Sequence, residues 1–377
     1  MPRRLAILAA LVSLLATAPA TLGVGTPPAI PAAAWVVVDP ATGETLASRA
    51  PDRELPMAST TKIMTALVVL ESADLDEVMT VPPEAARIGE SSGGLVAGER
   101  LRVRDLLTAL LVPSGNDAAV TLADGVAGSQ RAFVELMNQR AAEMGLTHTS
   151  FANPHGLDAP GHHSSVADLV TLARVAMRDP VFREIVAQRR ASIPGPGGRG
   201  VREYRSENAL LDIDPEADGV KTGSTDGAGF ALVAHARRKA LGVQLYAAII
   251  GSPSPDQRAL DAARLLDYGF SQYARATLVS ADAPVGRAPV DDRPGTDVPY
   301  RAASDLSAAI RLGAPVTEVV TAPAELRAPV AAGQVVGTIT LRQGDRVLGR
   351  RDLLAMRSAS EPGVWDRVRA GIGALIP

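Results

Sequence analysis

The strongest constraint on this chain is the tetrapeptide Ser59-Thr60-Thr61-Lys62, which stands directly before an apolar run at 63–70. The run is typical of a buried helix. Positions three apart lie on one face of a helix, so we expect the Lys62 amine to reach the Ser59 hydroxyl. A serine needs such a base to become a good nucleophile, and burial makes a lysine basic by lowering its pKa. The outward N–H groups of the helix start would also face a developing oxyanion.

Lysine usage supports a chemical role for Lys62. The chain has 35 arginines but only three lysines, Lys62, Lys221 and Lys239. Arginine keeps its proton at working pH, whereas lysine can lose it. Codon bias with leftover lysines is the alternative interpretation. We favour the chemical one, because two of the three lysines fall inside recognisable motifs.

The N-terminus predicts export. Met1-Pro2-Arg3-Arg4 is followed by an apolar run at 5–15 and by Ala18-Pro19-Ala20, which is the pattern of a signal peptide. The run is too short to span a bilayer, so we expect residues 1–20 to be removed. An uncleaved membrane anchor is the alternative. Loss of Arg3 and Arg4 would change the net charge from −3 to −5, which argues against nucleic acid as a partner.

Cysteine content and length limit the remaining classes. The 377 residues include no cysteine, which excludes thiol catalysis and cysteine metal sites. A chain of this length buries enough surface to fold without disulfides, and its length suggests about two domains. Aromatic residues make up only 3% of the chain, so base stacking is not an expected function.

The middle of the chain predicts an α/β domain at about 24–275, which is near the upper size of a single domain. Short apolar runs alternate there with longer amphipathic ones. Two strands before the Ser59 helix predict a sheet against which that helix packs. The expected strands are 34–38, 45–48, 218–223, 230–234 and 243–250, and the expected helices are 101–112, 131–144, 166–177 and 259–270, with another starting near Asp117.

The pattern changes after about residue 275. Pro-rich turns separate short β-like runs, which predicts a small β domain at 276–357 with a hairpin at Gln343-Gly344-Asp345. Residues 358–377 place Trp365 and several aliphatic residues on one stripe, which predicts an amphipathic helix that lies in a membrane interface. A helix packed on its own domain is the alternative. Gly371 and Gly373 lower the helix propensity of this segment in both interpretations.

Two more motifs carry chemistry-bearing residues. Ser114-Gly115-Asn116 forms a turn between two expected helices and could direct polar groups into a site, although such residues also favour plain turns. Lys221-Thr222-Gly223 ends an expected strand. A third pattern, Gly89-Glu90-Ser91-Ser92-Gly93, matches the nucleophile elbow Gly-x-Ser-x-Gly. The elbow requires a strand before it and a helix after it, so in this polar loop we interpret the match as chance.

Three histidines, His155, His162 and His163, fall in the expected loop 153–165. Zinc binding is one interpretation. Adjacent histidines point apart in an extended chain, and the spacing of a helical zinc motif is not present. We therefore expect these side chains to fix the loop by hydrogen bonds.

Taken in order, Ser59-Thr60-Thr61-Lys62, Ser114-Gly115-Asn116 and Lys221-Thr222-Gly223 form the motif set of penicillin-binding proteins and class A β-lactamases. From about Trp35 to the C-terminus the chain resembles the low-molecular-mass penicillin-binding proteins that are serine D-alanyl-D-alanine carboxypeptidases. The resemblance implies an α/β transpeptidase fold, an antiparallel sheet flanked by helices, plus a small C-terminal β-sandwich domain. The similar flanks are Ser114-Gly115-Asn116-Asp117-Ala118-Ala119, Gly156-Leu157-Asp158-Ala159-Pro160-Gly161 and Asp218-Gly219-Val220-Lys221-Thr222-Gly223-Ser224-Thr225.

The resemblance also implies residue roles. Ser59 would attack the bond between the two terminal D-alanines of a peptidoglycan stem peptide, with Lys62 as proton acceptor. Ser114, Asn116 and Lys221 would complete a hydrogen-bond network around Ser59. The remaining substrate-binding positions are Thr222 and Arg258 at the terminal carboxylate, Gly223 beside them, and Ser224, whose backbone N–H would join that of Ser59 in the oxyanion hole; many relatives have His at this last position.

The implied partners are the D-Ala-D-Ala terminus of the stem peptide, β-lactams as covalent inhibitors, and a membrane surface reached through the C-terminal helix. No cofactor or metal is expected. The protein would act in cell wall remodelling, in the periplasm or on the outer face of the cell membrane. Three rivals remain. They are a β-lactamase, which needs a carboxylate for its deacylating water; a silent wall-binding protein, against which the intact motifs argue; and a zinc peptidase.

Overall fold

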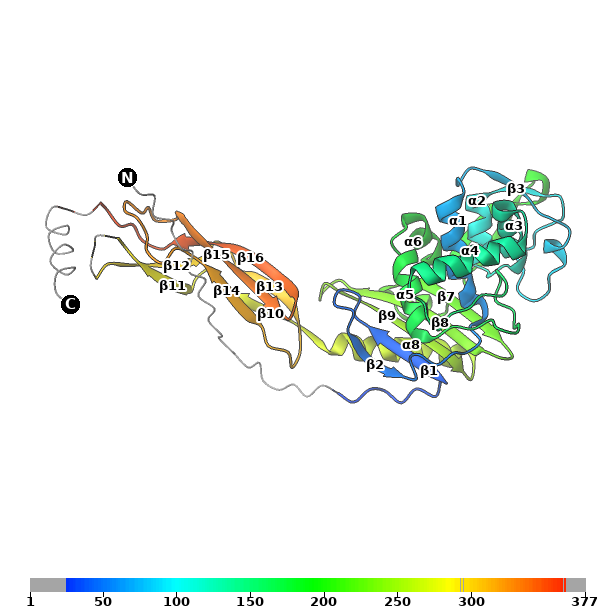
Figure 1. Cartoon of the computed structure of the whole chain (residues 1–377), viewed down its shortest axis with the longest axis horizontal. Coiled ribbons are helices and arrows are strands. Elements are labelled where there is room, and N and C mark those ends of the chain that lie inside the picture. The colour runs from blue at the N-terminus through cyan, green and yellow to red at the C-terminus, as the bar shows by residue number, and fades with distance from the viewer. Residues whose placement is uncertain (1–24, 292, 294, 362, 364–377) are drawn as a thin grey trace. The chain divides into compact units, whose positions relative to one another are not determined.

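The computed structural model describes residues 25–291, 293, 295–361 and 363. These residues divide into two compact units, Gly25–Ser271 and a second that begins at Gln272 (Figure 1). The predicted signal peptide lies outside the described residues, as does the predicted tail helix from residue 364 onward. Two predicted limits are corrected. The tail helix was expected from residue 358, but Ala359 pairs with Val330 and is buried in the core of the second unit. The domain limit was expected at 275/276, but strand β10 (Tyr273–Val279) crosses it and the units divide at 271/272.

A five-stranded antiparallel sheet is the centre of the first unit, in the order β2-β1-β9-β8-β7. All five strands expected from the sequence are present, and the last three extend beyond the predicted ends. The long connection from β2 to β7 carries most of the helices and two of the three motifs, while Lys221-Thr222-Gly223 lies in β7 itself. The strands are β1 (Ala34–Val38), β2 (Thr45–Arg49), β7 (Ala217–Thr225), β8 (Gly229–Arg238) and β9 (Val243–Ser252).

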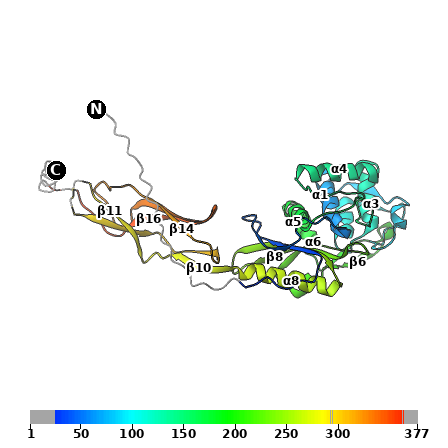
Figure 2. The same cartoon turned by 60° about the horizontal axis from the view of Figure 1, so that its bottom comes forward.

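The sheet is covered on both faces, as its apolar sequence predicts. Successive side chains of a strand point to opposite faces. In β1, Val36 belongs to the main helical core, whereas Val37 contacts the position of Gly269 in helix α8 (Pro255–Ser271). Figure 2 shows α8 below the sheet and α5 (Val166–Ala176) above it. Gly269 permits this packing, since a Cβ there would lie 2.6 Å from a Leu245 methyl.

The helices over the other face mostly follow their predicted ranges. One correction concerns residues 100–102, which form strand β4 (Arg100–Arg102) paired with β3 (Val78–Thr80), so the following helix starts at Val103. Helix α6 was not predicted, because seven residues are too few to show a helical period. The helices on this side are α1 (Lys62–Ser72), α2 (Val103–Leu111), α3 (Asn116–Ala127), α4 (Gln130–Glu143) and α6 (Pro180–Val186); the short α7 (Leu210–Ile213) precedes β7.

The second unit consists of β-strands, as predicted. Its larger sheet has the order β11-β12-β16-β15-β14, and β10 pairs with β13 in a second sheet. Leu306 of β13 shares a core with Ile339 of β15 and Leu353 of β16, which joins the two sheets. The predicted hairpin at residues 343–345 connects β15 to β16. The strands are β10 (Tyr273–Val279), β11 (Pro284–Pro289), β12 (Asp297–Ala302), β13 (Leu306–Arg311), β14 (Thr317–Thr321), β15 (Val335–Gln343) and β16 (Arg346–Ala355).

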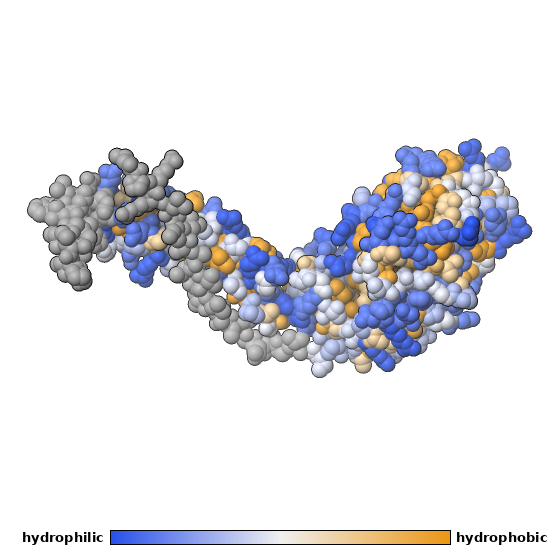
Figure 3. Space-filling model, in the orientation of Figure 1, coloured by the Kyte–Doolittle hydropathy of each residue, from blue (hydrophilic) through white to orange (hydrophobic). Residues whose placement is uncertain are grey.

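The visible surface of each unit mixes hydrophilic and hydrophobic residues (Figure 3). Exposed large apolar side chains, such as Val201 and Val335, are distributed between the units. No helix within the described ranges is long and apolar enough to cross a membrane.

Candidate active site

Ser59 lies in a single 3₁₀ turn, η1 (Ala58–Thr61), and helix α1 follows directly from Lys62. The turn fits closely against two glycines. A Cβ on Gly156 would lie 2.8 Å from the Ser59 backbone nitrogen, and one on Gly223 would lie 2.9 Å from it. Ala58 has a positive φ of 49°, which is a strained conformation for a residue with a Cβ. Close packing from both sides therefore holds the serine in place.

The Lys62 amine is fully buried and has three oxygen partners. It lies 2.8 Å from Ser59 Oγ, as the three-residue spacing predicts. It also lies 2.6 Å from Asn116 Oδ1 and 2.7 Å from the carbonyl oxygen of His155. The amide of Asn116 is oriented by its other end, because Nδ2 donates to the Gly89 carbonyl at 3.0 Å.

These partners suit a neutral amine that acts as a base. The Asn116 and His155 oxygens can only accept, whereas the Ser59 hydroxyl can also donate. A neutral Lys62 would donate its two N–H bonds to the two carbonyl oxygens and would turn its lone pair toward Ser59. Burial lowers the pKa of Lys62 well below its usual value, and the positive charge of Lys221 lowers it further.

The turn at Ser114-Gly115-Asn116 is more than a helix cap. Ser114 has a positive φ of 64°, and its buried hydroxyl has no hydrogen-bond partner among the described residues. Gly115 is required sterically, since a Cβ there would lie 2.6 Å from an Asp117 carboxylate oxygen. The turn thus directs Asn116 to Lys62 and leaves the buried hydroxyl of Ser114 without a partner in the described structure.

Asp117 fixes the loop that passes this turn. Its carboxylate accepts from the Ser92 hydroxyl at 2.7 Å and from the backbone nitrogens of Gly93 and Leu95 at 2.8 and 3.0 Å. The Asn116 nitrogen donates to the Ser91 carbonyl at 2.8 Å. The Gly-x-Ser-x-Gly match is therefore part of an irregular loop that supports the turn, and not a strand-to-helix elbow.

Strand β7 brings Lys221 and its neighbours to Ser59. Gly223 lies against the turn that holds Ser59, which places Ser224 next along the same strand. The Lys221 amine is buried and donates to the carbonyl of Thr222 at 3.0 Å and its hydroxyl at 3.4 Å. Burial lowers the pKa of Lys221 to about 8, against an opposing effect from the Glu207 carboxylate. The positive charge of Lys221 acts on Lys62, whereas the hydrogen bonds of the Lys221 amine go to its neighbour Thr222.

Arg258 reaches the same strand from helix α8. Its guanidinium is buried and donates to the carbonyl oxygens of Gly223 at 3.1 Å, Ala231 at 3.4 Å and Glu207 at 3.4 Å. Burial lowers the pKa of Arg258, and Glu207 opposes this. Three of its five N–H groups already donate to backbone carbonyls, so fewer donors remain for a ligand carboxylate.

Glu207 is the charged site residue nearest the cations that the sequence did not indicate. Its carboxylate lies 3.5 Å from the Thr222 hydroxyl, and its charge raises the pKa values of Lys62, Lys221 and Arg258. No spacing or motif singled it out, because it lies in the connection before α7 and meets the cations only through the tertiary fold. The His155 carbonyl and Asp117 were missed as site groups for the same reason.

The histidines fix the loop, as predicted. The His162 ring contacts the Thr61 hydroxyl at 2.8 Å and accepts from the Ala152 nitrogen at 3.0 Å. His155 accepts from the Leu157 nitrogen at 3.2 Å. Burial lowers the pKa of His155 to about 3 and that of His162 to about 4, so both stay neutral. Within the described ranges no group of His, Asp and Glu residues could hold a metal ion.

A serine backed by a buried lysine, with further buried cations alongside, defines a serine-type hydrolase site without a histidine base. Comparison with known proteins agrees. Residues 22–254 match the D-alanyl-D-alanine carboxypeptidase family, and residues 273–361 match the C-terminal domain of penicillin-binding protein 5. The chain therefore belongs to the D-alanyl-D-alanine carboxypeptidase family.

Similar proteins cover both units. The chain is 34% identical over 363 residues to D-alanyl-D-alanine carboxypeptidase DacD of Salmonella typhimurium, which covers 91% of this chain and 90% of that protein. It is 33% identical to DacC of Escherichia coli, with 90% and 87% covered. Among solved structures, penicillin-binding protein 5 from Haemophilus influenzae has a TM-score of 0.64 at 28% identity and covers 89% of this chain and all of that one. The predicted fold class and enzyme class are confirmed.

Proposed function

We propose that Ser59 carries the acyl-enzyme by which this carboxypeptidase removes the terminal D-Ala from peptidoglycan stem pentapeptides. The observation that carries the assignment is the 2.8 Å approach of the buried Lys62 amine to Ser59 Oγ. Lys62 takes the proton as Ser59 attacks the carbonyl between the two D-alanines. The backbone N–H groups of Ser59 and Ser224 stabilise the oxyanion, which is the principal electrostatic requirement of acyl transfer.

The departing D-Ala requires a proton, and Lys62 is the group that has just accepted one. Ser114 belongs to the same turn as Asn116, which contacts Lys62. Its buried hydroxyl has no partner within the described residues, which supports a role in relaying that proton to the leaving nitrogen. A water molecule then attacks the ester of the acyl-enzyme, again with Lys62 as base, and releases the shortened peptide. The same attack on a β-lactam ring would leave a stable acyl-enzyme.

Recognition of the terminal carboxylate rests on Lys221, the Thr222 hydroxyl, Gly223 and Arg258. Lys221 supplies a positive charge, and its amine donates only to the adjacent Thr222. Thr222 supplies a hydroxyl that lies 3.5 Å from the carboxylate of Glu207. Positive groups that surround a short polar side chain suit a substrate that ends in a carboxylate.

Covalent labelling tests this assignment. Purified protein should bind a fluorescent penicillin in a band that survives denaturing gels and should release D-Ala from a pentapeptide. Ser59→Ala should lose both, while its thermal unfolding stays within a few degrees of the parent, since removing one hydroxyl typically changes stability little. Labelling of Ser59→Ala at the parent level would assign the nucleophile to another residue.

The domain limits and attachment are part of the proposal. We assign residues 1–20 to a signal peptide, 25–271 to the catalytic domain, 272–361 to the β domain and the residues after 361 to a membrane-associating helix. The amphipathic stripe with Trp365 supports the last assignment. Truncation before Trp365 should move the protein from the membrane fraction to the exported soluble fraction with D-Ala release unchanged. Equal fractionation of the two forms would contradict the attachment.

A further inference from the structure

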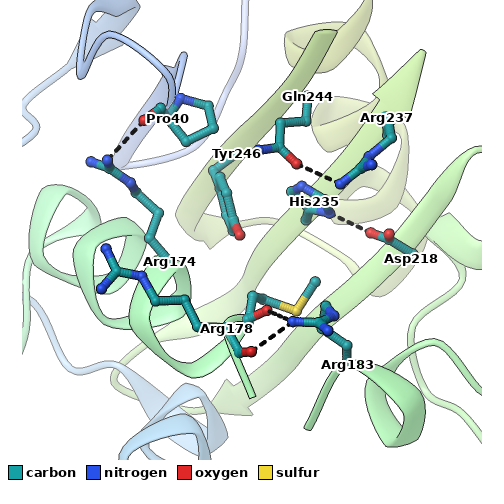
Figure 4. A pocket seen from close by; sticks show the side chains of 10 residues that line it. Pro40, Arg174, Arg178, Arg183, Asp218, His235, Arg237, Gln244 and Tyr246 are labelled. Atoms are coloured by element: carbon teal, nitrogen blue, oxygen red, sulfur yellow. Dashed lines mark hydrogen bonds and ion pairs between the residues drawn. The ribbon is translucent and has the colours of Figure 1, made fainter. Parts of the chain in front are cut away.

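A second concentration of positive charge lies in the first unit, away from Ser59. A cavity of about 670 Å³ opens over the end of α5, the start of α6 and strands β7, β8 and β9. Four arginines line it: Arg174, Arg178, Arg183 and Arg237 (Figure 4). None of the residues assigned above to catalysis or carboxylate binding contributes to it.

The arginines contact neutral acceptors and not carboxylates. Arg174 donates to the Pro40 carbonyl at 2.9 Å, and Arg237 donates to Gln244 Oε1 at 2.9 Å. Arg183 donates to two carbonyls at the end of α5, at 2.6 and 2.8 Å. In the described part of the chain no ion pair joins any of the four to an acid, whereas the neighbouring Arg238 pairs with Asp214 and Asp267. Their charge is therefore not neutralised locally.

Helix capping explains part of this arrangement. Arg183 donates to the carbonyls of Met177 and Arg178 directly after α5, and cations are favourable at a helix C-terminus. Capping does not explain Arg237, which comes from strand β8, nor the side chain of Arg178, which has no hydrogen bond or ion pair to another described residue. A further reason is needed for guanidinium groups to converge from three elements.

The floor of the cavity contains a buried histidine with an unused nitrogen. His235 is only 3% exposed, and its Nδ1 contacts the Asp218 carboxylate, which orients the ring. Nε2 has no hydrogen-bond partner within the described residues. Buried polar atoms of this kind normally have a partner in a folded protein. A ligand with both acceptor oxygens and an acidic hydrogen would suit either protonation state of the ring.

Tyr246 lies beside His235, with 4.5 Å between the ring centroids. Burial raises the pKa of Tyr246 to about 12, so its hydroxyl remains a donor. The positive charges of Arg174, Arg183 and Arg237 act on this hydroxyl in the opposite direction. Three guanidinium groups are thus close enough to influence one oxygen, and Figure 4 shows the arginines around the Tyr246 ring.

We propose that this cavity binds a phosphate-bearing anion. Four guanidinium groups against one carboxylate, Asp218, leave an excess of positive charge that a single carboxylate ligand would not neutralise. The planar fork of arginine matches the oxygens of phosphate, and the cavity volume lies within the range of small-molecule sites, about 300–1,000 Å³. The ligand is either a free phosphate or diphosphate or the phosphate group of an ester.

The site adjoins the catalytic strand without belonging to the catalytic machinery. Asp218 and Gly223 both lie on β7, five residues apart, which corresponds to about 16 Å along an extended strand. Variants at the cavity rim are therefore expected to leave D-Ala release unchanged, and that assay reports whether each variant has folded.

Calorimetric titration of the full chain at low salt tests the proposal, with inorganic pyrophosphate in one arm and glycerol 3-phosphate in the other. We expect saturable binding in at least one arm, weakened at least tenfold in Arg178→Ala/Arg237→Ala. Both arginines are exposed, so the variant should fold. Arg131→Ala/Arg199→Ala removes the same charge from exposed positions outside the cavity and should bind like the parent.

The outcomes are distinct. Tighter binding of pyrophosphate would identify a free anion as the ligand, and tighter binding of glycerol 3-phosphate would identify an ester. Absence of binding in both arms, or equal weakening by the two double variants, would overturn the proposal. If Arg178→Ala/Arg237→Ala loses D-Ala release, Arg237→Glu alone replaces it, with the same expected loss of binding and with parental binding as the contradicting result.

Discussion

Two positively charged regions of the first unit differ in how they hold their charge. At Ser59 the cations are buried, and burial lowers the pKa values of Lys62, Lys221 and Arg258. In the cavity over β8 the cations are four arginines, at least two of which are well exposed, and among the described lining residues Asp218 is the only carboxylate. One region uses mainly lysine, the other only arginine.

The difference separates two uses of a positive side chain. A buried lysine can exchange a proton, so it can serve as a base, whereas an exposed arginine keeps its proton and can only attract and orient an anion. A chain with three lysines has placed two of them where exchange is possible.

The largest effect is expected from Lys62→Arg, which gives the Ser59 site an arginine in place of its lysine, as in the cavity. The charge is kept, but the base is lost. Acylation by penicillin and kcat/KM for a pentapeptide should fall by about 10²–10⁴-fold, the usual contribution of a general base. Stopped-flow acylation measures this directly. Lys239→Arg, at an exposed lysine, is the matched control and should be unchanged. Acylation by Lys62→Arg within tenfold of the parent would show that charge suffices.

Arg258→Ala tests whether the arginine near Ser59 binds an anionic group, as we propose for the cavity arginines. Charge-assisted hydrogen bonds contribute about 1.5–3 kcal/mol, so kcat/KM for a D-Ala-D-Ala peptide should fall roughly 10–100-fold. A peptide with an amidated terminus should be a poor substrate for the parent, and the mutation should harm it much less. The two losses remove one interaction and should be non-additive. Fully additive losses would mean that Arg258 does not act on the carboxylate.

The pH dependence separates lysine from arginine within the carboxylate site. Lys221, with its pKa of about 8, is charged below that pH and neutral above it. If its charge holds the substrate carboxylate, kcat/KM should fall up to about tenfold for each pH unit above 8, the slope for loss of one proton. Lys221→Arg should remove this alkaline decline. A decline of the same slope in that variant would assign it to another group.

The sequence predicted the lysine site of this contrast and missed Glu207 and the arginine cavity. The three-residue spacing of Ser59 and Lys62 predicted a contact that the structure contains, because local helix geometry is fixed by sequence. Strands β8 and β9 were visible as apolar runs, and β7 was predicted as a strand that ends in a glycine. Glu207 and the cavity arginines were not visible, since they come together from separate elements through tertiary packing alone. The start of helix α2 was placed two residues early, because the apolar period runs on into strand β4.

The smallest expected effect concerns Glu207, the one acid that acts on all three site cations. Its carboxylate lies 3.5 Å from the Thr222 hydroxyl, where under the proposed function it would compete with the terminal carboxylate of a substrate. Glu207→Gln keeps the shape and removes the charge, so the site would resemble the arginine cavity with its unneutralised charge. KM for a D-Ala-D-Ala peptide should fall a few-fold, since partly exposed charge interactions are worth about 0.2–1 kcal/mol. The amidated peptide should show no such gain. Glu203→Gln, at an exposed acid on strand β6 (Val201–Arg205), controls for net charge and should not change KM. A rise in KM for Glu207→Gln would instead make this carboxylate a partner that orients Thr222, and the two regions would then differ in their acids as well as in their cations.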